Sequence, residues 1–483
     1  MRLTKLRGLA AVMILGAALG AFANEDDRYE EKVDRTMPFR GGKVNVDAKF
    51  SSVSVRGTSR SDVELHAVIR ASDPELGKQI HVIVTETNGV TIRTDFPENY
   101  RMRGHISYSI DIDLTVPANA PVSVHNRFGS ISARGIGPGG ELENAQGSIA
   151  VRESRGPLTA ENSFGSIALD DQDGDAILRN QNGSVSVDEV HGNIEVSNRF
   201  GSVSITDVER NATVTNTNGS VNISDVKGAL KLTNSFASVE VSTIGRGAEI
   251  ENSNGRAEVS NVNGQTTIRN SFGSTIATSI NGNLTINSEN AKVEARGIKG
   301  TASVSTTFGT INLSDVSSQA TIKNANGAIN VSDIKGPLRA ETQFASINAT
   351  RIDGNTDIEN ANGSVTLKTI AGNVRVRTSF GSAFVEDVTG GVAVENANGA
   401  ISVTGLTGSG CQPVWLKTNF SSLRVDLPSS PNYKVTARTS FGHISTELPI
   451  ATTSMSGETI IGTIGRGGCQ LELSNQNGNI TIR

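Results

Sequence analysis

The sequence predicts an all-β protein, a parallel β-solenoid made of 18-residue coils with two strands each. The motif NRFGS, which begins at Asn126, recurs every 18 residues without insertion through 16 units, the last opening at Asn396. Within each unit, apolar and polar residues alternate over two short segments, which is the pattern of strands with one buried face. A fixed short period of this kind is typical of coils that bury themselves against their neighbours.

Each unit is numbered here from its opening residue as position 0. Positions 5 and 7 are apolar, as in Val185 and Val187, and so are positions 14 and 16, as in Ile194 and Val196. Position 3 is Gly in thirteen units and Ala in three, which indicates a tight corner or a close approach of the next coil. Each unit is therefore strand, turn, strand, turn, and we expect right-handed coiling.

Position 2 alternates between Phe and a polar residue, almost always Asn, so the full repeat is 36 residues. The Phe coils carry Phe128, Phe164, Phe200, Phe236, Phe272, Phe308, Phe344 and Phe380. We expect these rings to fill a corner of the core, with Asn-Gly forming the alternate turns. The alternative is an outward row of rings about 9.6 Å apart that makes contacts with a partner.

The N-terminal residues 1–23 have the features of a secretory signal peptide. Basic residues precede an apolar run, Leu9–Leu19, and Ala21-Phe22-Ala23 fits the cleavage pattern. The mature chain is expected to begin near Asn24, and no later apolar run approaches the ~20 residues of a membrane helix. We therefore expect an exported protein that resides in the periplasm, the cell envelope or outside the cell.

The regular coils are expected over residues 126–409, between two caps. Residues 24–42 are charged and polar, which indicates a solvated leader. Residues 43–125 contain irregular strand patterns and are expected to cap the exposed edge of the first coil. An insertion near Gly410 shifts the register, and residues 410–483 are expected to form further coils and a C-terminal cap.

The only two cysteines, Cys411 and Cys469, both fall in the C-terminal cap. In an exported protein such a pair predicts a disulfide. Closing a loop of about 59 residues would stabilise the cap by about 4 kcal/mol in the chain-entropy model.

The two outward strand faces differ in composition. Positions 15 and 17 are often charged, whereas positions 6 and 8 carry mostly small hydroxyl and amide side chains. The second surface is a candidate for binding a glycan or another surface, although a plain solvated β-surface has the same composition. Its candidate binding residues are Ser204, Thr206, Asn222, Ser224, Asn312, Ser314, Asn330 and Ser332.

The residues predict neither catalysis nor a bound cofactor or metal. The 16 coils have no insertion that could wall a cleft, and the six histidines show no ligand spacing. Position 9 carries carboxylates in consecutive coils, for which a turn role is expected and Ca²⁺ is the alternative. A net charge of −5 and a pI near 5.8 argue against nucleic acid as a partner.

The alternation NxFGS…NxNGS with V-x-V strands, behind a signal peptide and a looser β-rich head, resembles a bacterial family of β-strand-repeat proteins called putative adhesins. The resemblance covers about Gly42 to Arg483 and implies a secreted or envelope-located β-solenoid; the family is a domain of unknown function and supplies no catalytic residues. The first hypothesis is a non-catalytic, adhesin-like protein that binds along the Ser/Thr/Asn surface or the Phe residues. The alternatives are an envelope scaffold or periplasmic partner-binding protein that self-associates through its end coils, and a polysaccharide-acting β-helix enzyme.

Overall fold

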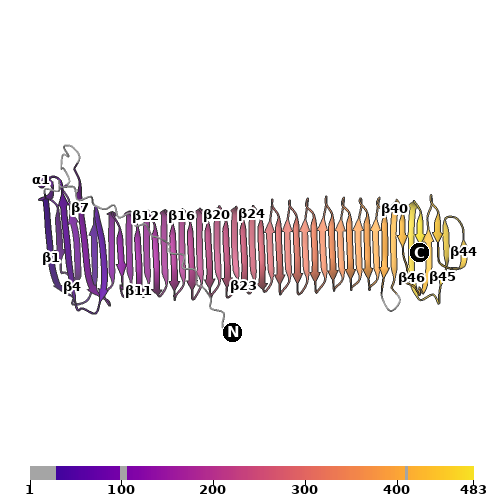
Figure 1. The fold of residues 1–483 in the computed structure, drawn as a ribbon, viewed down its shortest axis with the longest axis horizontal. Coiled ribbons are helices and arrows are strands. Elements are labelled where there is room, and N and C mark those ends of the chain that lie inside the picture. The colour runs from indigo at the N-terminus through magenta and orange to yellow at the C-terminus, as the bar shows by residue number, and fades with distance from the viewer. Residues whose placement is uncertain (1–28, 98–105, 408–411) are drawn as a thin grey trace, which may run out of the picture. The chain divides into compact units, whose positions relative to one another are not determined.

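A computed structural model describes residues 29–97, 106–407 and 412–483. Apart from α1 (Pro74–Gly77), the described elements are strands (Figure 1). The predicted fold class, an all-β solenoid of stacked parallel coils, is confirmed, while the hand of the coil stays a prediction. None of the helical residues that the structure describes belongs to a helix long and apolar enough to cross a membrane. The predicted signal peptide, residues 1–23, lies outside the described residues.

The chain divides into two compact units, Met1–Ala150 and Val151–Arg483. The strands of the first unit are β1 (Tyr29–Pro38), β2 (Lys43–Ala48), β3 (Ser51–Thr58), β4 (Asp62–Ala71), β5 (His81–Thr85), β6 (Gly89–Asp95), β7 (Tyr108–Pro117), β8 (Val122–Phe128), β9 (Ile131–Arg134) and β10 (Gly140–Gln146). Strand β11 (Ile149–Arg155) spans the division.

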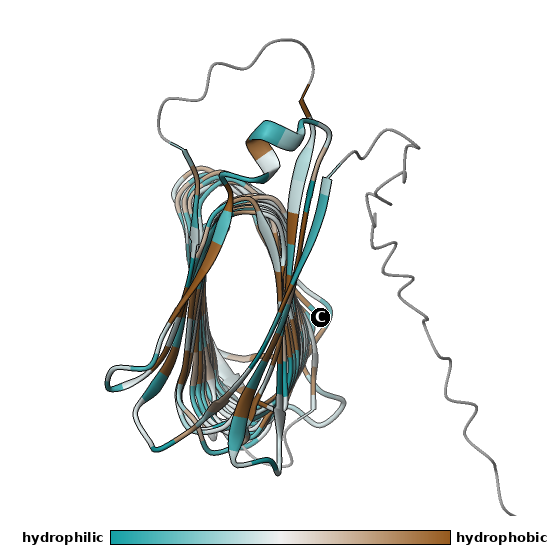
Figure 2. Ribbon diagram, turned by 90° about the vertical axis from the view of Figure 1, so that its left-hand side faces the viewer, coloured by the Kyte–Doolittle hydropathy of each residue, from teal (hydrophilic) through white to brown (hydrophobic). Residues whose placement is uncertain are grey.

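The first unit does not stack its coils in chain order. Strand β2 pairs in parallel with both β6 and β8, and β3 pairs in parallel with both β7 and β9. The coil formed by β2 and β3 therefore lies between two segments that follow it in the chain. Antiparallel strands continue each sheet, because β5 pairs with β6, β4 with β7 and β1 with β4. Hydrophobic and hydrophilic residues alternate along these strands, as Figure 2 shows by colour.

The stretch predicted to be a solvated leader contains the ten-residue strand β1, so that expectation was wrong for residues 29–38. Strand β1 is mostly exposed, and it pairs along its full length with β4. Its charged side chains are of the kind that blunts an exposed sheet edge. Charge alone suggested a solvated segment, but a charged strand at a sheet edge has the same composition.

In the second unit, two sheets alternate along the chain. Sheet A contains β13 (Ile167–Asp173), β15 (Val185–Val190), β17 (Val203–Val208), β19 (Val221–Val226), β21 (Val239–Ile244), β23 (Ala257–Asn263), β25 (Thr275–Asn281), β27 (Val293–Ile298), β29 (Ile311–Val316), β31 (Ile329–Ile334), β33 (Ile347–Ile352), β35 (Val365–Ile370), β37 (Ala383–Val388), β39 (Ile401–Leu406), β41 (Leu423–Val425), β43 (Ile444–Thr446) and β47 (Ile480–Ile482).

Sheet B of the same unit contains β12 (Leu158–Phe164), β14 (Ala176–Asn182), β16 (Ile194–Phe200), β18 (Ala212–Asn218), β20 (Leu230–Phe236), β22 (Ala248–Asn254), β24 (Thr266–Phe272), β26 (Leu284–Ser288), β28 (Ala302–Thr306), β30 (Ala320–Asn324), β32 (Leu338–Thr342), β34 (Thr356–Asn360), β36 (Val374–Thr378), β38 (Val392–Asn396), β40 (Val414–Phe420), β42 (Tyr433–Arg438), β44 (Ala451–Met455), β45 (Thr459–Ile464) and β46 (Cys469–Asn477).

Each regular strand pairs in parallel with the strand 18 residues further on, as Val203 does with Val221. The aliphatic residues at positions 5, 7, 10, 14 and 16 are buried, and position 0 adds a buried polar side chain to the core. The amide of Asn180, for example, donates to the carbonyl oxygens of Gly165 and Gly183 at 3.1 and 3.0 Å. These bonds satisfy backbone oxygens at the corner, while the Oδ1 atom of Asn180 is buried without a hydrogen-bond partner in the described part of the chain.

The position-3 glycines permit the close stacking that the sequence predicted. A Cβ atom added at Gly201 would lie 2.2 Å from the carbonyl oxygen of Gly183 in the preceding coil. Gly201 also has a φ of +127°, a region that residues with a Cβ rarely adopt. Gly201 therefore has both of the constraints that the sequence indicated, whereas Gly327, Gly363 and Gly399 have the close approach without the positive φ.

The C-terminal coil lies inside the stack rather than at its end. Strand β46 pairs in parallel with both β40 and β42, and β47 pairs in parallel with both β41 and β43. The coil formed by β46 and β47 thus separates two coils that precede it in the chain. Antiparallel strands β45 and β44 then continue sheet B beyond β42.

Candidate functional site

The eight candidate residues of the Ser/Thr/Asn surface lie on the outward face of sheet A in two groups of four. In the first group, Ser204 and Thr206 of β17 pair with Asn222 and Ser224 of β19. The second group is built in the same way on β29 and β31, and consists of Asn312, Ser314, Asn330 and Ser332. The structure brings the members of each group together.

The two groups do not join into one lattice. Between them, position 6 of sheet A carries Glu240, Glu258, Ile276 and Glu294, whereas position 8 continues as Ser242, Ser260 and Thr278 and is interrupted at Arg296. In the second group the amide of Asn330 donates to Asn312 at 2.9 Å, so part of its hydrogen-bonding capacity is used within the sheet. The role of this surface in binding stays a prediction.

The Phe side chains of the second unit point outward, which corrects the expectation that they fill the core. Position 2 is the last residue of a seven-residue sheet B strand such as β16, and it lies beyond the buried aliphatic positions. We call the exposed set the Phe row. Its members are 43–77% exposed and comprise Phe164, Phe200, Phe236, Phe272, Phe308, Phe344, Phe380, Phe420 and Phe441.

Asn residues separate neighbouring rings of the Phe row. In the strand register, Asn218 lies between Phe200 and Phe236. The alternation continues through the inserted C-terminal coil, where Asn477 lies between Phe420 and Phe441. The intervening amides bind backbone: the Nδ2 groups of Asn182, Asn254, Asn326, Asn362 and Asn398 donate to carbonyl oxygens of the preceding coil at 3.0–3.3 Å.

In the first unit, the corresponding ring is not exposed in the same way. Phe128 is half-buried and stacks on Phe50, with ring centroids 4.7 Å apart. Phe96 and Tyr108 each pack edge-on against Phe50 and are tilted against one another. The prediction that these rings point inward is therefore closest to the structure at Phe128, whose ring packs into an aromatic cluster.

The position-9 carboxylates belong to a second corner, which we call the αL corner. All 16 residues at position 9 have a φ between 52° and 73°, whatever their side chain. Asn, Asp and Gly tolerate this left-handed conformation best, so backbone geometry accounts for much of the predicted carboxylate series. Within the described ranges, no group of three His, Cys, Asp or Glu side chains could hold a metal ion.

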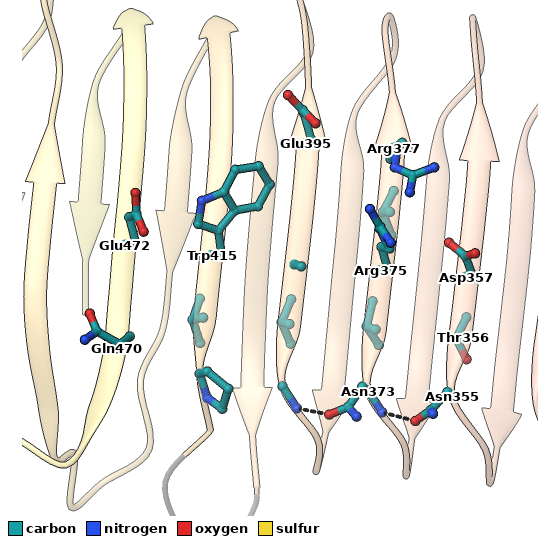
Figure 3. A pocket seen from close by; sticks show the side chains of 17 residues that line it. Asn355, Thr356, Asp357, Asn373, Arg375, Arg377, Glu395, Trp415, Gln470 and Glu472 are labelled. Carbon is teal, nitrogen blue, oxygen red and sulfur yellow. Dashed lines mark hydrogen bonds between the residues drawn. The ribbon is translucent and has the colours of Figure 1, made fainter.

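An open depression of about 770 Å³ lies on the outward face of sheet B near the C-terminal coil (Figure 3). Five position-15 residues form a row across neighbouring strands, in the order Asp357, Arg375, Ala393, Trp415 and Glu472. Ala393 has the smallest side chain at position 15 in the 16 units, and it lies between two of the largest. The depression exists because this short side chain separates Arg375 from Trp415.

The polar groups of this depression differ from those beside it. At position 17 of the same strands, Lys417 pairs with Glu395 at 3.0 Å, and Arg377 pairs with Glu359. Arg375, Trp415 and Glu472, by contrast, have no side-chain hydrogen bond or ion pair within the described part of the chain. These three side chains are therefore available to a ligand.

The predicted disulfide cannot be placed, because Cys411 lies outside the described residues. Cys469 is the first residue of β46. The pairing of these two cysteines stays a prediction.

Sequence reasoning missed Trp415 and its surroundings. The signal that could have found them is the position-15 series, in which Ala393 interrupts a run of charged or hydroxyl side chains just before the chain's single Trp. The four-residue insertion before Trp415 obscured this alignment.

Three solved structures resemble the chain weakly. The first is a putative cell adhesion protein from Clostridium sporogenes, with 9% identity, a TM-score of 0.20, and coverage of 43% of this chain and 100% of that chain. The second is a putative lipid binding protein from Parabacteroides distasonis, with 11% identity, a TM-score of 0.15, and coverage of 73% of this chain and 98% of that chain. The third is a putative adhesin from Parabacteroides merdae, with 9% identity, a TM-score of 0.13, and coverage of 72% of this chain and 96% of that chain. With TM-scores this low, these likenesses carry no argument about function. No curated protein matches the chain.

A family model also matches the C-terminal third of the chain. The match covers residues 317–483, which include the last regular coils, the depression around Trp415 and the inserted C-terminal coil. The resemblance to a β-strand-repeat family is therefore confirmed, and residues 317–483 are similar to the family described as Toastrack DUF4097.

Proposed function

We propose that this protein is an exported, non-catalytic, adhesin-like protein that binds an extended polysaccharide along the Phe row. The observation that carries the proposal is the regular exposure of nine Phe side chains at one corner of the second unit. The rings are separated by Asn side chains, but a row of exposed rings at one fixed spacing indicates a repeated contact surface, because water-exposed rings are otherwise unfavourable. Neither the backbone nor the core requires Phe at these positions.

The spacing of the row favours a polymer over a compact partner. Neighbouring rings are two coils apart, about 9.6 Å, which is comparable with the length of a disaccharide in an extended β-linked glycan. Aromatic faces stack on the apolar face of sugar rings, and the flanking Ser, Thr and Asn side chains can exchange hydrogen bonds with hydroxyl groups. Many weak, identical contacts along one chain give high total affinity without a deep pocket.

The site geometry argues against a polysaccharide-cleaving enzyme. Asp357 and Glu472 are four strands apart in the depression, about 19 Å, whereas paired glycosidase carboxylates are at most about 9.5 Å apart. The third carboxylate there, Glu395, is held in an ion pair with Lys417. An envelope scaffold that stacks through bare end coils is also disfavoured, because antiparallel strands such as β1 and β44 extend the sheets at both ends.

The test is a binding assay of the purified protein on insoluble β-linked polysaccharides and isolated cell walls. The main variant carries Phe236→Ser, Phe272→Ser and Phe308→Ser, and we expect its affinity to fall at least about tenfold because three adjacent contacts are lost. The matched control places three Ser residues on the αL corner, where Ser279 shows that Ser is accepted. It carries Asp207→Ser, Asp225→Ser and Asn261→Ser, and it should bind like the parent.

A further variant tests the other candidate surface, with Ser204, Thr206, Asn222 and Ser224 changed to Lys. Loss of binding in this variant alone would move the contact to the Ser/Thr/Asn surface. Full binding by the folded Phe variant, or no binding by the parent, would contradict the proposal.

A further inference from the structure

We propose that the depression around Trp415 binds a neutral pyranose unit of a glycan, at a site separate from the Phe row. This goes beyond the proposed function, because the site is a single pocket on the face of sheet B rather than a repeated contact at a corner. The shape of the depression, its unpartnered side chains and its charge support such a ligand.

The shape fits a small flat ligand. The depression of about 770 Å³ is within the range of about 300–1,000 Å³ that is usual for small-molecule sites. Its floor at Ala393 is apolar and short, and Trp415 forms one wall from the neighbouring strand. Figure 3 shows the indole turned toward the strand that carries Glu395, so the ring borders the hollow and does not fold away from it.

The polar groups are arranged on both sides of this platform. Arg375 lies two strands from Trp415 on one side, about 9.6 Å away, and Glu472 lies one strand away on the other. A guanidinium donates hydrogen bonds and a carboxylate accepts them, and sugar hydroxyl groups can do both. A ring above Ala393 would lie between Arg375 and Trp415, so it could stack on the indole and receive hydrogen bonds from the guanidinium, while Glu472 lies beyond Trp415 where the next unit of a glycan would reach it.

The charge of the lining selects among sugars. Ionisable side chains in the depression are Asp357, Glu395 and Glu472 against Arg375 and Arg377, a small acidic excess. The partners Glu359 and Lys417 already neutralise Arg377 and Glu395. Arg339 pairs with Asp357 in the same way at 4.0 Å. The charges left without a partner are therefore Arg375 and Glu472, which balance, so the lining does not compensate the charge of an acidic sugar and favours a neutral ring.

Trp415 is the single Trp among 483 residues, so its fluorescence reports on this site alone. The experiment titrates the purified protein with cellohexaose, chitohexaose and maltohexaose, and with an oligogalacturonate as the acidic probe, up to millimolar concentration. We expect a saturable change in emission with at least one neutral oligosaccharide and a weaker or absent response to the acidic one. Calorimetry on the same solutions detects binding that leaves the emission unchanged.

Two variants and two controls complete the test. Ala393→Leu fills the depression and Arg375→Ala removes a donor, and each should weaken binding at least about tenfold. Thr285→Leu makes the matched change at the same coil position in β26, away from the depression, and should bind like the parent. The Phe-row variant should also bind like the parent, which separates this site from the proposed function.

The proposal is overturned if neither emission nor heat responds to the neutral oligosaccharides. It is also overturned if the acidic probe binds as tightly as the best neutral one, or if Ala393→Leu retains full affinity while folded.

Discussion

The two corners of each coil repeat in different ways: position 9 keeps one backbone conformation with varied side chains, whereas position 2 keeps Phe in every second coil. At the αL corner, every residue from Gly135 to Gly405 at position 9 has a positive φ, so backbone geometry restricts which residues fit. At the Phe row, no residue has a positive φ, and each ring is 43% exposed or more. Repetition of the αL conformation is therefore explained by the fold, and so are the position-3 glycines, whereas the repetition of Phe itself is left for function to explain.

The largest effect on stability is expected at the αL corner. Asp207 has a φ of 57°, and Asp207→Val places a β-branched residue in a conformation that it strongly disfavours. We expect a loss of about 1–3 kcal/mol, measured as a shift of the urea unfolding curve. The control Asp207→Asn should be near neutral, because Asn261 occupies the same position in a nearby coil. Equal effects of Val and Asn would mean that φ does not select the residue at this corner.

A smaller effect is expected at the Phe row. Phe236 is 51% exposed, so Phe236→Ser loses about half the burial of a core ring, or about 1 kcal/mol. The same urea unfolding experiment measures it. A loss above about 3 kcal/mol is typical of a fully buried Phe and would remove the contrast between the two corners.

The ion pair between Asp333 and Arg351 at the αL corner makes the stability of the folded protein depend on pH. Hydrogen bonds from Arg351 at 2.6 and 2.7 Å lower the pKa of Asp333 from its usual 3.8 to about 2. Because the folded pKa is depressed, the stabilisation is present above pH 3.8 and is lost as the pH falls toward 2. Arg351→Met should therefore lower Tm slightly at pH 5 and cost less at pH 2, with an effect below about 1 kcal/mol because the pair is exposed. A difference in Tm that grows toward pH 2 would contradict this assignment.

The smallest effect concerns carboxylates that repel one another beside the αL corner. Partial burial and the nearby carboxylates of Asp170 and Asp207 raise the pKa of Asp188. Since the folded pKa is raised, ionised Asp188 is unfavourable at neutral pH, and this cost disappears as the pH falls below that pKa. Asp188→Asn should raise Tm by a degree or less at pH 7 and have no effect near pH 3. A decrease in Tm at pH 7 would show that Asp188 has a favourable partner.

The strand positions and the tight position-3 corners could be predicted from the sequence because they follow from alternation and from glycine. Alternation does not say where the buried part of a strand ends, so Phe200 was expected inside although it lies beyond the last core residue. Strand β1 was missed within the predicted leader, because charged residues are compatible with both a solvated segment and an edge strand.

The order of the C-terminal coils was also missed, because the chain does not stack them in sequence. The Phe and Asn alternation contained the signal: the coils of Phe420 and Phe441 follow each other in the chain, and the coil of Asn477 comes last. Preserving the alternation in space requires Asn477 between the two Phe coils, where the structure places it. One side of the depression at Trp415 depends on this placement of the last coil between two earlier ones, because Glu472 belongs to that last coil.

The claim that the Phe row binds a polysaccharide is tested most directly by removing its rings in steps. Variants with one, two, four and nine members of the Phe row changed to Ser are compared for affinity toward the polysaccharide that the parent binds, with the αL-corner triple variant as control. The account predicts a stepwise fall in affinity with each ring removed, while the control and the unfolding curves change little. Affinity that is independent of the number of rings, in folded variants, would contradict it.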